Sequence, residues 1–167
     1  IKTEKILYSK KDEVIFTQGK TEANILSKYK IFSENVEFEI NSRILKSQKK
    51  TKLINNNTHV NLDRFHLSIN QNQLKGENIL LITNFGLPKS DKFYFSSAII
   101  DLNDNSFLAK DTKIKIHKDI FNNSENDPRI EGVSAKGNKD ATELNKAIFT
   151  SCKKNDNCPP WSISAKK

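Results

Sequence analysis

The sequence predicts an all-β protein, a sandwich, barrel or roll made of roughly a dozen short strands. Three observations lead to this prediction. Short apolar segments recur with a period of two, turn-forming residues separate them, and no long window shows the 3.6-residue period of an amphipathic helix. The 167 residues are expected to form one domain, residues 1–167.

The N-terminal third is predicted to contain a hairpin and one clear strand. Residues 6–17 form strand, turn and strand, and Gly19 is expected to end the second of these strands. Residues 33–40 show the best alternation of the chain, which predicts a half-buried strand. Its apolar face consists of Val36, Phe38 and Ile40.

The rest of the chain continues the same pattern. Asparagines at 55–57, and Asn103, Asp104 and Asn105, predict turns, because asparagine and aspartate tolerate the left-handed backbone region. Residues 142–147 are expected to form one helical turn. Further strands are expected at residues 60–62, 67–69, 79–82, 93–102, 107–109, 114–116, 130–135 and 147–150.

The formal net charge of +8 raises the question of a nucleic-acid partner. Lysine supplies nearly all of this charge, and the arginines are only Arg43, Arg64 and Arg129. Base readout depends on arginine, and single-strand binding depends on aromatic residues set among basic ones. We therefore expect no nucleic-acid binding. Attraction to anionic or phosphorylated lipids needs only diffuse positive charge and fits better.

The sequence offers no constellation that predicts catalysis. It contains neither a Gly-x-Ser-x-Gly elbow nor a glycine-rich phosphate loop. The three histidines, His59, His66 and His117, stand apart, and the acidic residues are scattered. We expect no catalytic residues, no cofactor and no enzymatic activity.

Two sequence patterns resemble metal sites, but each lacks residues that such a site requires. Residues 101–105 match the first three ligand positions of an EF-hand loop, but Ser106 and Thr112 stand where that loop needs glycine and glutamate. Cys152 and Cys158 have no second pair to complete a zinc site, unless His117 came from afar. We expect no metal site.

The segment 149–165 holds both cysteines and the only tryptophan. A disulfide between Cys152 and Cys158 would close a short loop and stabilise the fold by roughly 2 kcal/mol on the chain-entropy model. Alternatively, one or both cysteines pair with a segment outside this sequence. The residues alone leave both pairings open.

Three stretches carry a resemblance to a known family. Residues 101–111 and 117–135 form the first two, and the third is Phe-Thr-Ser-Cys from Phe149 to Cys152, then a polar loop, Pro160-Trp161 and a strand. They resemble the N-terminal periplasmic, OstA-like domain of the lipopolysaccharide assembly protein LptD, in its alphaproteobacterial form. Residues 19–82 resemble the repeated OstA strand pattern more weakly.

The resemblance implies an antiparallel β-jellyroll, or open β-roll, of the OstA/LptA type with an apolar interior. It implies a domain at the periplasmic face of the outer membrane. There it would receive lipopolysaccharide from an LptA-like periplasmic bridge, joined by strand augmentation, and pass it to the translocon. The chain would continue past Lys167 into its own outer-membrane β-barrel, which holds an LptE-like lipoprotein plug.

The resemblance also suggests roles for particular residues. The acyl chains of the lipid would lie in a groove lined by alternating apolar side chains, although the same residues also suit a closed core. Cys152 occupies the position of a family cysteine that pairs with the barrel, whereas Cys158 departs from that pattern. The residues expected to line the groove are Val36, Phe38, Ile40, Ile114, Ile116, Trp161 and Ile163.

Three other functions remain as alternatives. A free-standing LptA-like bridge protein would share the fold and lack the barrel. A structural or glycan-binding β-domain would have a packed interior and no groove. A redox enzyme that uses Cys152 and Cys158 would need a thiol with a pKa well below about 8.5.

Overall fold

The structure is a computed structural model that describes residues 1–25, 27–122, 126–153 and 162–165. Within them the chain forms one sheet of fifteen strands, and every strand pairing is antiparallel. One short 3-10 turn, η1, spans Lys118–Phe121. No helix in the described part of the chain has the length and apolar content needed to cross a bilayer. The all-β prediction is confirmed.

The strands follow one another with few long connections. In chain order they are β1 (Lys2–Ser9), β2 (Val14–Ile25), β3 (Tyr29–Glu34), β4 (Glu37–Glu39), β5 (Ile44–Ser47), β6 (Thr51–Asn55), β7 (Thr58–Leu62), β8 (Arg64–Ser68), β9 (Gln73–Ile82), β10 (Lys92–Asp101), β11 (Phe107–Lys115), β12 (Arg129–Gly137), β13 (Thr142–Asn145), β14 (Ile148–Thr150) and β15 (Ile163–Ser164).

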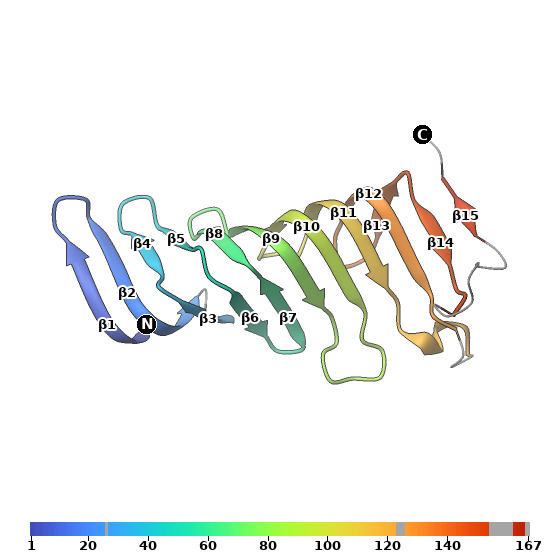
Figure 1. The fold of residues 1–167 in the computed structure, drawn as a ribbon, viewed down its shortest axis with the longest axis horizontal. Helices are drawn as coiled ribbons and strands as arrows, with labels where there is room; N and C mark the ends of the chain where they lie inside the picture. Colours follow the sequence, from blue (N-terminus) through green and yellow to red (C-terminus); the bar gives the residue numbers. More distant parts are fainter. Residues whose placement is uncertain (26, 123–125, 154–161, 166–167) are drawn as a thin grey trace.

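The strands stack side by side along the long axis of the molecule, from β1 at one end to β15 at the other (Figure 1). Between β2 and β9 the sheet divides into two paths. One runs through β4, β5 and β8, and the other through β3, β6 and β7. Because both paths start at β2 and end at β9, these eight strands form a closed circuit of pairings.

We call the two paths the upper and lower half-sheets, after their places in Figure 1. The first residues of β9 pair with β8 in the upper half-sheet, and its last residues pair with β7 in the lower one. Strands β10, β11 and β12 extend both half-sheets in the same way, since β12 pairs with β13 at one end and with β14 at the other. Each long strand therefore belongs to both half-sheets.

A row of residues with positive φ marks the line where the half-sheets meet, which we call the crease. It consists of Gly19, Asn35, Asn78, Asp111 and Lys146, with φ between 47° and 81°. The register between β1 and β2 shifts opposite Gly19, as in a β-bulge, whereas Asn78, Asp111 and Lys146 kink their strands with the pairing register unchanged. Polar side chains form hydrogen bonds at the crease: Asn35 Oδ1 accepts one from the Gly19 amide at 3.0 Å, and Asn78 Nδ2 donates to Asp63 at 2.8 Å.

The phase of the buried positions also shifts by one residue at the crease. In β9, Leu74 is buried before the crease and Ile79 after it, and β10, which has no residue with positive φ, shows the same shift from Phe95 to Ala98. A strand with an unbroken period of two would turn one half outward. The phase shift keeps both halves facing the space between the half-sheets.

Three local predictions were wrong, two of them at the crease. Gly19 does not end a strand but bends β2 with a φ of +81°. Residues 33–40 are not one strand, because Asn35, with a φ of 50°, separates β3 from β4. Residues 142–147 are not helical, since Thr142–Asn145 form β13 and pair with residues 134–137 of β12.

Candidate functional site: the interior of the folded sheet

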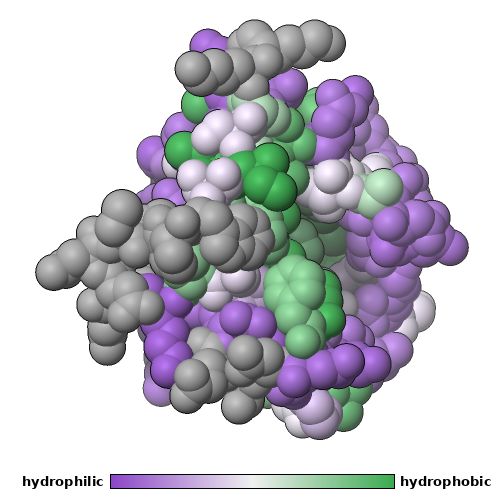
Figure 2. Space-filling model, turned by 90° about the vertical axis from the view of Figure 1, so that its right-hand side faces the viewer, coloured by the Kyte–Doolittle hydropathy of each residue, from purple (hydrophilic) through white to green (hydrophobic). Residues whose placement is uncertain are grey.

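Side chains from both half-sheets form one apolar interior. No charged side chain is among the buried residues of the described chain. Figure 2 shows the interior at the C-terminal end, where hydrophobic side chains gather in the middle and hydrophilic ones surround them. The buried cluster comprises Ala23, Ile25, Tyr29, Ile31, Val36, Leu45, Leu53, Val60, Leu62, Phe65, Leu67, Leu74, Ile79, Phe95, Ala98, Ile100, Leu102, Phe107, Ala109 and Ala135.

The interior carries hydroxyl groups near the N-terminal end. Thr21 donates to Thr17 at 2.7 Å, and the hydroxyls of Ser33 and Thr51 lie 2.7 Å apart. All four residues are buried. Since the hydroxyls satisfy one another, this part of the interior can be buried without leaving polar atoms unpaired.

Aromatic rings fill the interior farther along. The rings of Phe95 and Phe107 lie 5.2 Å apart, and Phe93 lies 6.3 Å from each of them. Phe95 and Phe107 are buried. Phe93, near the start of β10, is half-buried and packs against the cluster. These rings give the C-terminal half of the interior a wide apolar surface.

A small group of contacts joins the two half-sheets on the side away from the crease. Tyr29 begins β3 in the lower half-sheet, and Leu102 follows β10 at the end of the upper one. The Tyr29 hydroxyl donates to the Leu102 carbonyl oxygen at 3.0 Å, and Lys28 Nζ donates to the same oxygen at 2.9 Å. We call these three residues the latch.

Two of the three latch residues are buried, whereas Lys28 is exposed. The side chains of Tyr29 and Leu102 are 4 % and 2 % exposed. Burial raises the pKa of the Tyr29 phenol above its ordinary value, because the charged phenolate would lose its hydration. Tyr29 is therefore a neutral donor over the physiological range, which is the state the hydrogen bond to Leu102 needs.

Four of the residues expected to line a groove are buried or half-buried, and of these Val36 belongs to the interior cluster and Phe38 packs against it. Val36 and Ile114 are 3 % and 4 % exposed. Phe38 is half-buried, packs against the cluster and pairs with Leu45 across the upper half-sheet. Ile116 is half-buried just beyond the end of β11.

The other expected lining residues do not join the cluster. Ile40 follows β4 and is 37 % exposed, and Ile163 in β15 is 64 % exposed. Ile40 lies outside because β4 ends at Glu39 and the chain turns there into β5. Trp161 lies outside the described residues.

The C-terminal cysteine segment adjoins β12. Cys152 is buried, and its carbonyl oxygen accepts a hydrogen bond from Arg129 Nη1 at 2.5 Å. Its amide donates to the Thr150 hydroxyl at 3.3 Å. Cys158 lies outside the described residues, so the disulfide pairing stays a prediction.

The residues that resemble metal ligands serve other contacts. Asp101 and Asp104 each accept a hydrogen bond from the backbone amide two residues on, as in Asx turns, and this bond lowers the pKa of Asp104. His117 Nδ1 lies 2.8 Å from Asp91. Within the described ranges, no three His, Cys, Asp or Glu side chains gather as a metal site requires.

Sequence reasoning missed the crease and the latch. The crease has a detectable pattern: an apolar alternation that changes phase within one strand, next to Gly, Asn or Asp. The latch has no detectable sequence pattern, because 73 residues separate Tyr29 from Leu102.

No known family model matches this sequence, and no curated protein is similar to it at a significant level. The function must therefore be argued from the geometry of the interior and from the resemblance of the three C-terminal stretches.

Proposed function

We propose that this chain is a non-enzymatic lipid-transport domain with an open β-roll, or jellyroll, of the OstA/LptA type. It receives lipopolysaccharide from a periplasmic bridge and passes it to an outer-membrane translocon. One observation carries the proposal: an uncharged apolar interior extends from β3 to β12 between two half-sheets. The resemblance of residues 101–111, 117–135 and 149–167 to the LptD family suggests lipopolysaccharide as the lipid.

In this proposal the half-sheets are the walls of the roll. The crease is its closed side, where the long strands run continuously from one half-sheet to the other. The latch lies on the open side, where Lys28, Tyr29 and Leu102 join the walls without a strand pairing. A lipid enters the interior when the latch parts.

The dimensions of the interior suit acyl chains. From β3 to β12 the order of strands in the lower half-sheet includes six steps, and steps of about 4.8 Å give a length of about 29 Å. This length is close to the ~30 Å hydrocarbon thickness of a bilayer, so it exceeds the depth of one leaflet. Extended acyl chains therefore fit along it.

The free energy gained by burying an acyl chain exceeds the free energy lost when the latch hydrogen bonds break. A hydrogen bond contributes a net stability of about 1 kcal/mol, and each buried methylene contributes about 0.8 kcal/mol. An acyl chain with a dozen methylenes therefore stabilises the open state by more than the latch stabilises the closed one. The same arithmetic explains why lipopolysaccharide needs a protein to cross water.

The edge of β1 is the proposed contact with the bridge. β1 pairs with β2 along one side only within the described chain. Its residues Ile6, Leu7 and Tyr8 are 40–55 % exposed. An LptA-like bridge adds a strand here by augmentation. In this proposal the chain continues at the other end into its own barrel with an LptE-like plug, and the domain lies at the periplasmic face of the outer membrane.

Photo-crosslinking with purified lipopolysaccharide tests the proposal. A photoreactive phenylalanine analogue is placed at Phe38, which packs against the interior cluster, at Ile116, which is half-buried and proposed to line the interior, or at Val133, which is 56 % exposed. We expect a lipid adduct at Phe38 and Ile116 and none at Val133. Equal adducts at all three positions, or none at the two interior ones, would contradict the proposal.

A further inference from the structure

A second surface of the molecule has the form of a binding site. A groove of about 580 Å³ crosses strands β8 to β13. Its lining residues Ile99 and Leu108 are exposed and alternate along β10 and β11 with buried neighbours of the interior cluster, so the groove lies on the outer face of the upper half-sheet. We call it the outer groove.

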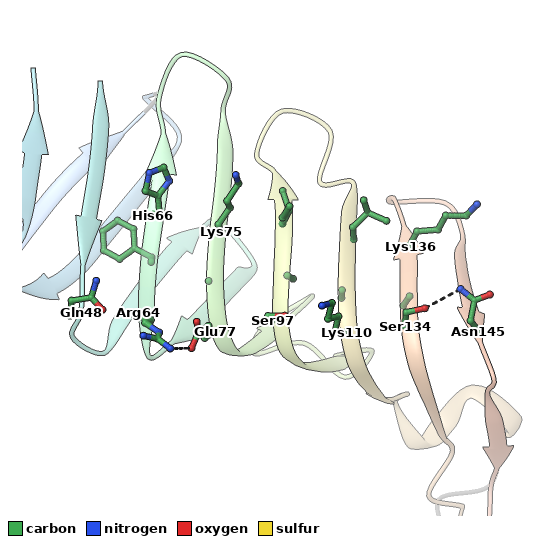
Figure 3. A pocket seen from close by; sticks show the side chains of 17 residues that line it. Gln48, Arg64, His66, Lys75, Glu77, Ser97, Lys110, Ser134, Lys136 and Asn145 are labelled. Atoms are coloured by element: carbon green, nitrogen blue, oxygen red, sulfur yellow. Dashed lines mark hydrogen bonds and ion pairs between the residues drawn. The ribbon is translucent and has the colours of Figure 1, made fainter. Parts of the chain in front are cut away.

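Two rows of side chains form the walls of the outer groove, and both run across the strands (Figure 3). The lower row presents one polar residue from each of six successive strands: Arg64, Glu77, Ser97, Lys110, Ser134 and Asn145. The upper row is His66, Lys75, Ile99, Leu108 and Lys136. Between the rows lies the backbone of Gly76, Ala98 and Ala109.

The charge of the groove is strongly positive. Arg64, Lys75, Lys110 and Lys136 line it, against the single carboxylate of Glu77. Glu77 forms an ion pair with Arg64, so it neutralises that end alone. Lys136 pairs at 3.0 Å with Glu143, and both side chains are 61 % exposed. Such an exposed pair contributes little stability and exchanges readily for another anion.

The centre of the groove is apolar. Ile99 and Leu108 pair across β10 and β11 and are 39 % and 61 % exposed. Lys75 and Lys136 stand on either side of them in the same row. An apolar centre between cations, beside a row of hydroxyl and amide groups, suits a molecule with carbon–hydrogen faces, hydroxyls and negative charges.

The spacing of the strands selects among such molecules. Neighbouring strands are about 4.8 Å apart, and an extended peptide advances about 3.4 Å per residue. Because these two repeats differ, successive residues of a peptide that crosses the strands cannot stay aligned with successive strands. One unit of an extended β-linked sugar chain is close to the strand spacing in length, so each strand faces one sugar.

We propose that the outer groove binds an extended anionic oligosaccharide, which runs across the strands with one sugar unit per strand. Lys75, Lys110 and Lys136 contact its carboxylates or phosphates, and Ser97, Ser134 and Asn145 hydrogen-bond its hydroxyls. This site is separate from the interior and does not rest on the lipid-transport function.

Calorimetric titration of the whole chain with defined oligosaccharides tests the proposal. The probe is a β-1,4-linked hexamannuronate, and the matched neutral ligand is β-1,4-linked mannohexaose. We expect hexamannuronate to bind more tightly than mannohexaose at low salt and to lose affinity as salt rises, because surface ion pairs are screened. Equal affinities at every salt concentration would overturn the anionic assignment.

Two matched variants place the site. K75Q/K110Q removes two cations from the groove, and K10Q/K11Q removes two from the exposed β1–β2 turn. We expect about a tenfold loss of hexamannuronate affinity in the first and none in the second. All four lysines are exposed, and circular dichroism confirms that both variants fold. Equal affinities of the two variants would overturn the location.

A third ligand tests the chemical class. Hexaglutamate with an acetylated N-terminus and an amidated C-terminus carries the same number of carboxylates on a peptide backbone with a different repeat. We expect it to bind more weakly than hexamannuronate. If hexaglutamate binds as tightly, the sugar assignment is wrong. Crosslinking at Phe38 and Ile116 would be unaffected by any of these results, so the two proposals fail separately.

Discussion

The hydroxyl of Tyr29 lies 3.0 Å from the carbonyl oxygen of Leu102, and this contact joins the lower half-sheet to the upper one. Lys28 Nζ reaches the same oxygen at 2.9 Å. Both connections lie on the side away from the crease. The latch thus links parts of the chain that strand pairing does not connect.

Removing the Tyr29 hydroxyl should weaken the latch. Tyr29→Phe keeps the buried ring and loses the donor to Leu102, so we expect a loss of about 1 kcal/mol in the free energy of unfolding. Urea denaturation measures this change. Tyr8→Phe is the matched control, because Tyr8 is 53 % exposed. An equal effect of both substitutions would show that the latch carries no stability.

The same residue predicts a dependence of stability on alkaline pH. Burial raises the pKa of Tyr29 in the folded state, so the unfolded chain loses this proton first, near pH 10. The stabilisation is complete below that pH and is lost as pH rises towards the folded-state pKa. We expect the unfolding free energy of the native chain to fall more steeply above pH 10 than that of Tyr29→Phe. Parallel curves for the two proteins would contradict this account.

The side of Gly76 that faces the interior has no room for a methyl group. A Cβ there would lie 2.6 Å from Leu62 Cδ1. We expect Gly76→Ala to cost roughly 1–3 kcal/mol of stability through overpacking. Leu62→Val removes the clashing atom, so it should cost less in the Gly76→Ala background than alone. Thermal denaturation of the four proteins measures the coupling, and strict additivity would contradict the contact.

The crease requires the left-handed conformation of Asn35. Its φ is 50°, and its side chain accepts a hydrogen bond from the Gly19 amide. Asn35→Val places a β-branched residue in this region and removes the acceptor, whereas Asn35→Gly removes only the acceptor. We expect the valine variant to be less stable than the glycine variant by about 1–2 kcal/mol in urea denaturation. Equal stabilities would show that the bend does not depend on this conformation.

A strand could be predicted where a continuous apolar and aromatic run ends at a turn, even where its buried positions change phase. The predicted strand 93–102 agrees closely with β10, and the turn at 103–105 follows it. The prediction for 33–40 failed because the alternation of Val36 and Phe38 is regular in itself. Its phase differs from that of Tyr29 and Ile31, and only a comparison of the two segments reveals the bulge at Asn35.

Only part of the candidate site could be predicted from the sequence. Val36 and Ile114 were expected to be buried and are buried, because each lies on the apolar side of a segment with period two. The latch and the outer groove arise from pairings among distant strands. The row from Arg64 to Asn145 exists only through the register of six strands. No local pattern fixes that register.

The crease has a consequence for how such a chain can vary in size. Because Asn78 and Asp111 bend alternate strands in the same way, consecutive hairpins are nearly equivalent modules. Duplication or deletion of one hairpin adds or removes two strands, about 10 Å of length, and leaves the cross-section unchanged. The reach of the molecule is thus set by the number of hairpins, independently of the width of its interior.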